Sequence, residues 1–114
     1  DRAEDIIKVP ESQQQGIDFA YMENLVKKSN KLNVEVFFAI SVLHKKYISN
    51  FIEETKSMPE DKQKDFFEQK KKEFFKTIRF SEDEYNNFMK KHPDEINDYI
   101  SKNQLIREYL TTLN

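Results

Sequence analysis

The chain has 114 residues, of which 35% are charged and 37% are hydrophobic, and its formal net charge is −2. This length fits a single domain, and ten Phe and five Tyr are too many large apolar groups for a disordered chain. One Gly and no Cys exclude glycine-rich phosphate loops, disulfide scaffolds and thiolate zinc sites. No apolar run approaches the roughly 20 residues of a transmembrane helix, and the near-neutral charge disfavours nucleic acid as a partner.

Residues 1–16 lack helical periodicity and contain Pro10 and the only glycine, Gly16. We interpret them as a flexible leader that precedes a single helical domain over residues 17–114. The composition is rich in Lys, Asn and Glu and looks like the mature part of small exported or lipid-anchored bacterial proteins. That resemblance implies a place in the cell envelope, or secretion, if a signal sequence preceded Asp1.

The first predicted helix spans about Asp18 to Lys28, with Asp18 as its N-cap. The second spans about Val34 to Ser57 and has no evident breaker, and its wide apolar stripe is typical of a central helix. The β-branched start of this segment would also suit a strand, but the stripe runs far beyond strand length. The residues that we expect to be almost fully buried are Ile40, Leu43, Tyr47 and Phe51.

The third predicted helix follows Pro59 and reaches about Arg79. The segment Ser81-Glu82-Asp83-Glu84 has capping-box spacing and predicts the start of a fourth helix. Pro93 interrupts the helical pattern, so a last helix is expected from about Asp94 to Leu113. The predicted fold class is therefore all-α, a small and mostly antiparallel bundle of four or five helices.

The third predicted helix carries the most distinctive charge pattern. Between Lys62 and Arg79 lie seven basic and three acidic residues, and two Phe pairs flank three consecutive lysines. Phe66 and Phe75 are nine residues apart, so they point in opposite directions around a helix, and one core does not easily bury both.

This pattern predicts a docking site for an acidic, partly apolar protein, or for a second copy of the chain. An aromatic side chain exposed within a lysine cluster would serve as the anchor. The tentative partner-binding residues are Phe66, Lys70, Lys71, Lys72 and Phe75. The alternative is an ordinary bundle helix, in which all four Phe enter the core and the lysines form a solvated face.

The two histidines do not form a metal-binding pattern. His44 lies on the apolar face of the second predicted helix, and His92 lies beside a proline. Because a zinc site needs about three or four ligands, we predict no metal and no cofactor. We interpret His44 as a core or boundary histidine with one hydrogen-bond partner, able to sense pH if it is buried.

The sequence contains no nucleophile elbow, phosphate loop or dinucleotide fingerprint. We therefore predict a non-enzymatic protein-interaction or scaffold module. The alternative is a carrier of an apolar small molecule or lipid in an aromatic-lined bundle pocket. An enclosed pocket above about 300 Å³ would favour the carrier, and a solid core with an exposed groove would favour the interaction module.

Overall fold

The computed structural model of the chain describes residues 17–111, and within that range all regular structure is helical. The predicted leader, residues 1–16, and the end of the last predicted helix at Leu113 lie outside the described residues. The described helices are α2 (Phe19–Lys28), α3 (Val34–Ser49), α4 (Ile52–Thr55), α5 (Glu60–Lys76), α6 (Glu82–Lys91), α7 (Pro93–Lys102) and α8 (Gln104–Thr111). The described range thus holds seven helices, where four or five were expected for the whole chain.

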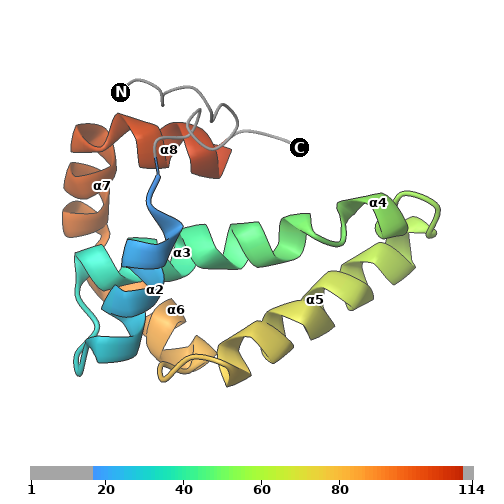
Figure 1. Cartoon of the computed structure of the whole chain (residues 1–114), viewed down its shortest axis with the longest axis horizontal. Coiled ribbons are helices and arrows are strands. Elements are labelled where there is room, and N and C mark those ends of the chain that lie inside the picture. Colours follow the sequence, from blue (N-terminus) through green and yellow to red (C-terminus); the bar gives the residue numbers. More distant parts are fainter. Residues whose placement is uncertain (1–16, 112–114) are drawn as a thin grey trace.

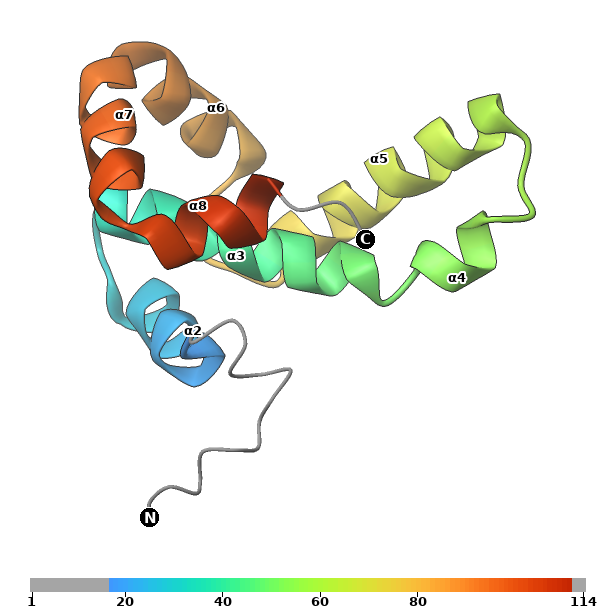
Figure 2. The ribbon, with the colours of Figure 1, turned by 90° about the horizontal axis from the view of Figure 1, so that it is seen from above.

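Helix α3 crosses the middle of the molecule, with α2, α6, α7 and α8 around its N-terminal half and α4 near its far end (Figure 1). Figure 2 shows α2 on one side of that half and α6 and α7 on the other. Five consecutive residues, 36–40, are buried as a result. The prediction of a central second helix is confirmed for this half, and the strand alternative is wrong.

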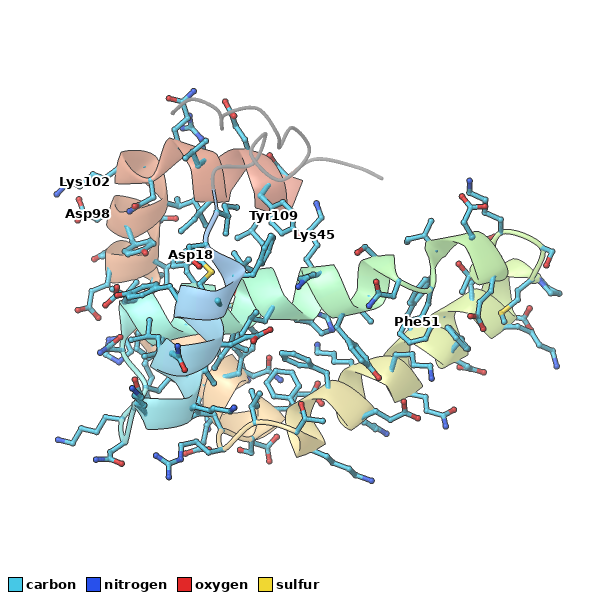
Figure 3. The ribbon with its side chains drawn as sticks, in the orientation of Figure 1. Asp18, Lys45, Phe51, Asp98, Lys102 and Tyr109 are labelled. Carbon is cyan, nitrogen blue, oxygen red and sulfur yellow. The ribbon has the colours of Figure 1, made fainter. Side chains whose placement is uncertain are left out.

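Two apolar clusters share α3, one on each side of it. The α5-side core joins α3 to α2, α5 and the segment after α5, and its buried residues are Val26, Val36, Ala39, Ile40, Leu43, Phe74, Phe75 and Phe80. The α8-side core joins α3 to α6 and α8, and its buried residues are Ile17, Phe37, Phe38, Val42, Phe88 and Ile106. Lys45 adds a polar tie on this second side, because its ammonium group donates to the backbone carbonyl of Tyr109 (Figure 3).

Side-chain caps fix where several helices begin. The Asp18 carboxylate accepts a hydrogen bond from the backbone N–H of Tyr21 at 3.0 Å, which confirms the predicted N-cap of α2. Asn33 caps α3 in the same way. The predicted capping box of α6 is also confirmed, with Ser81 and Glu84 each accepting a hydrogen bond from the backbone N–H of the other. Caps of this kind each stabilise a helix by about 0.5–2 kcal/mol.

The prediction of one continuous helix from Val34 to Ser57 is wrong, because α3 ends at Ser49 and a turn precedes α4. The Ser49 hydroxyl donates to the carbonyl of Lys46 at 2.7 Å, a local bond that competes with helix continuation. The turn lets the Phe51 ring pack edge-on against both Tyr47 and a side chain of α5 (Figure 3). Tyr47 and Phe51 are only half-buried, so the burial expected for them is also wrong, whereas Ile40 and Leu43 are buried as expected.

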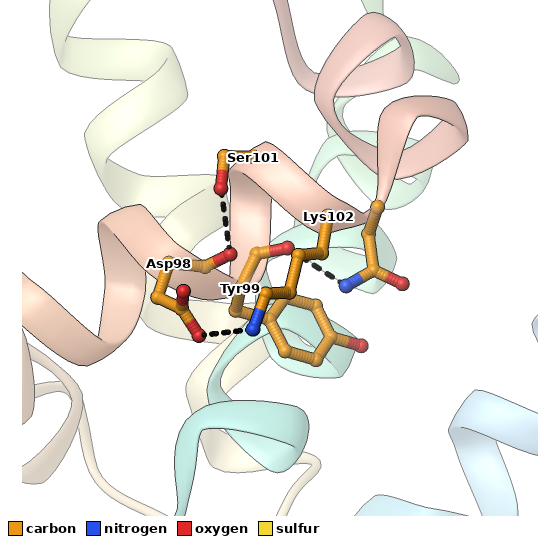
Figure 4. Close-up of polar contacts among 5 residues, drawn as sticks. Asp98, Tyr99, Ser101 and Lys102 are labelled. Atoms are coloured by element: carbon orange, nitrogen blue, oxygen red, sulfur yellow. Dashed lines mark hydrogen bonds and ion pairs between the residues drawn. The ribbon is translucent and has the colours of Figure 1, made fainter.

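The last predicted helix is divided at Asn103 into α7 and α8. The Asn103 side chain donates to the carbonyl of Tyr99 at 2.7 Å (Figure 4), and the backbone angles of Asn103 lie outside the helical region. Asp98 accepts a hydrogen bond from Lys102 within the same last turn of α7. Because an asparagine side chain can replace a backbone partner, the chain changes direction here without leaving that carbonyl unsatisfied.

Replacement of Ile40 with Ala is expected to lower the free energy of unfolding by about 2–5 kcal/mol, because the side chain is fully buried in the α5-side core. Leu105 is 50% exposed, so Leu105→Ala is the matched control and should change stability by less than about 0.5 kcal/mol. Urea unfolding followed by circular dichroism measures both. Equal losses would contradict the central position of α3.

Candidate functional site

A cleft of about 660 Å³ lies where α2, α3 and the end of α5 meet. Three segments that are far apart in the sequence therefore build it. Its lining residues are Glu23, Val26, Lys27, Leu43, Lys46, Tyr47, Asn50, Phe74, Thr77, Ile78 and Arg79.

The floor of the cleft is apolar and its rim is polar. Val26, Leu43 and Phe74 are buried members of the α5-side core, so the cleft rests on the core itself. The polar lining residues of α2 and of the segment after α5 are exposed, which makes the cleft a groove that opens to solvent. An apolar floor with polar groups around it is the usual composition of a binding site.

The charge of the lining is positive although the charge of the chain is negative. Lys27, Lys46 and Arg79 stand against a single carboxylate, Glu23. The three cations come from α2, from α3 and from the segment after α5. Long-range attraction of this sign favours an anionic ligand, and the apolar floor favours one with an apolar part.

Two of the cations are held in place by neighbouring groups. The Arg79 guanidinium donates to the backbone carbonyl of Ser29 at 2.9 Å and to the side chain of Asn30 at 3.2 Å. The Lys46 ammonium group lies 4.8 Å from the centre of the Phe19 ring, in cation–π geometry. Both contacts tie the rim to α2 or to the loop after it, so the positions of these charges follow from helix packing.

The structure brings together two of the five residues predicted as a partner-binding site. Phe66 is half-buried, with its ring 5.8 Å from that of Phe51. The Lys70 ammonium group lies 4.5 Å from the Phe51 ring and 5.3 Å from the Phe66 ring, and it pairs with Glu73 at 3.2 Å. The contacts of Phe66 and Lys70 with Phe51 join the middle of α5 to the joint between α3 and α4.

The other predicted residues lie apart from this pair. Lys71 forms an ion pair with Glu82 of α6 at 3.4 Å, and Lys72 is exposed. Phe75 is only 8% exposed and belongs to the α5-side core, where its ring packs against Tyr85. Of the two aromatic residues predicted as anchors, only Phe66 therefore reaches the surface of the described chain.

The cleft was not predicted from the sequence. Its cations are separated by more than fifty positions in the sequence, from Lys27 to Arg79. The sequence around each of them indicates only an ordinary solvated surface charge. Only the packing of α2 and α5 against the same side of α3 gathers them. Phe74 belongs to a Phe pair that the sequence did single out, but periodicity could not show that this ring would line a cleft.

Within residues 17–111, no group of three or more His, Asp or Glu side chains could hold a metal ion, and no helix is long and apolar enough to cross a membrane. No protein-family model, curated protein or solved structure matches the chain. The cleft is therefore interpreted from its own geometry and charge.

Phe75→Ala is expected to lower the free energy of unfolding by about 3–5 kcal/mol, because it removes a buried ring from the α5-side core. Phe66→Ala removes a half-buried ring and should cost about half as much or less. Chemical denaturation of the two variants gives the comparison. A larger loss of unfolding free energy for Phe66→Ala than for Phe75→Ala would show that Phe66, and not Phe75, is the core residue.

Proposed function

We propose that this chain is a non-enzymatic protein-interaction module that binds an acidic, partly apolar segment of another protein in the cleft between α2, α3 and α5. The observation that carries the proposal is the combination of an apolar floor with three cations and one carboxylate around it. A segment with apolar side chains on one face and carboxylates beside them complements both features.

The cleft is open to solvent, and an open cleft supports a protein partner more than a small molecule that would be enclosed in a pocket. The floor is formed by well-packed core residues, and exposed side chains border the opening. An exposed groove on a solid core was the arrangement expected for an interaction module. A location in the cell envelope remains a prediction from composition alone.

A carrier of an apolar anion is the second candidate, and the size of the cleft is the observation that favours it. A volume of about 660 Å³ lies within the roughly 300–1,000 Å³ range of small-molecule sites. A long-chain carboxylate would place its tail on the same floor and its head group among the same cations. The two candidates differ in how much of the rim each ligand would cover.

The test uses a short synthetic amphipathic peptide with Leu on one face and Glu on the other, titrated into ¹⁵N-labelled protein. We expect chemical-shift changes to centre on the residues that line the cleft, and affinity to fall as salt concentration rises. Lys27→Glu combined with Lys46→Glu should weaken binding by about tenfold or more, because two attractive rim charges become repulsive.

The matched control is Lys72→Glu combined with Lys76→Glu, which makes the same charge change at exposed positions of α5 outside the cleft. This control should leave affinity within about twofold of the wild-type value. If only the control variant loses binding, the partner docks on the lysine face of α5 that the sequence predicted. Binding of dodecanoate but not of the peptide would identify the carrier instead.

A further inference from the structure

The His44 side chain of α3 packs against two Phe rings of α5. Its ring centre lies 5.3 Å from that of Phe74 and 6.3 Å from that of Phe75. Its Nε2 atom is buried and has no hydrogen-bond partner among the described residues, so the partner expected from the sequence is not found at this atom. A histidine in this environment is accommodated best when it is neutral.

The charged groups that face this histidine belong to α5 and α6. They are Lys71 and Glu82, which form an ion pair with each other at 3.4 Å. Burial is the main cause that lowers the pKa of His44 below its ordinary value of 6.5, and the positive charge of Lys71 lowers it further. Glu82 acts in the opposite direction and offsets part of the effect.

The histidine is connected directly to the cleft. Phe74, which packs on the His44 ring, lines the cleft, and so does Leu43, the residue before His44 in α3. A charge on the His44 ring would sit against two Phe rings and would repel Lys71. The stretch of α5 that carries these groups is also the stretch that closes one side of the cleft.

We propose that protonation of His44 loosens the packing of α5 on α3 and thereby weakens partner binding at the cleft. The proposal rests on the proposed function of the cleft and adds a proton-controlled regulation to it. The neutral His44 ring is compatible with the packing of α5 on α3. The full stabilisation of this packing is therefore present above the ordinary histidine pKa. This stabilisation decreases as the pH falls below the ordinary histidine pKa and through the lower pKa that His44 has in the folded state.

Two measurements on the whole chain test the proposal, each made at about pH 7.5 and about pH 5.5. One is the affinity of the Leu/Glu peptide, and the other is the hydrogen-exchange protection of the α5 amides. We expect the wild-type affinity to fall across this interval by a measurable factor of at most about tenfold, since one proton shifts an equilibrium by at most about tenfold per pH unit and the ordinary histidine pKa lies about one unit above the lower pH. Protection of the α5 amides should fall with it.

His44→Leu removes the titrating group from an apolar site and should flatten both responses, and any remaining change reports titration of the peptide or of other groups of the protein. His44→Gln keeps a neutral polar side chain and serves as the second variant. His92→Gln is the matched control, because His92 pairs with Glu95 at 2.8 Å on another part of the structure and should leave the wild-type response intact.

Equal pH responses in the wild type and in both His44 variants would overturn the proposal. If the peptide binds and its affinity does not depend on His44, the proton-controlled regulation is wrong and the proposed function stands. If the peptide does not bind at about pH 7.5, the proposed function is wrong, and α5 protection alone decides whether His44 controls the packing. Loss of α5 protection in acid that disappears in His44→Leu supports that control, and protection independent of His44 refutes it.

Discussion

Burial of the N-terminal half of α3 is the constraint on which the rest of the structure depends. Residues 36–40 project around the whole helix and are all buried, so apolar groups must cover α3 from every direction. The α5-side core and the α8-side core are the two halves of this cover. A single layer of helices on one side could not provide it, and this explains why short helices gather around one end of α3.

The C-terminal half of α3 lacks this complete cover, and the cleft lies beside it. Packing is carried by aromatic contacts between α3 and α5, which continue from Phe74 through Tyr47 and Phe51 to Phe66. The groove is left where α2 ends beside α3 and α5 turns toward α6, with core residues as its floor and long cationic side chains at its edge. The same residues therefore belong to the core and to the floor of the cleft, so a change in the core on this side alters the cleft directly.

The packing of α5 also explains why its lysines and the cations of the cleft differ in their surroundings. Lys70 pairs with Glu73 within α5 and lies over the Phe51 ring at the α3–α4 joint, whereas Lys71 pairs with Glu82 and so links α5 to α6. Exposed or partly exposed ion pairs contribute only about 0–1 kcal/mol each, so their effect lies mainly in orienting the helix. Lys27 and Lys46, in contrast, border an apolar floor, where a bound carboxylate would be partly removed from water and attracted more strongly.

The sequence by itself determined the all-helical class, the Asp18 and Ser81–Glu84 caps, the interruption before Pro93 and the central role of the segment after Asn33. These features depend on periodicity and on neighbours within one helical turn, which the sequence displays directly. The helix breaks at Asn50 and Asn103 were not predicted, although a local side-chain hydrogen bond lies at each of them. Tertiary structure decided how the first break is used, because the Phe51 ring that follows it packs against Phe66 of α5. It also decided that Phe75 is buried while Phe66 reaches the surface, and that Lys27, Lys46 and Arg79 surround one groove, because such contacts join residues that only folding brings together.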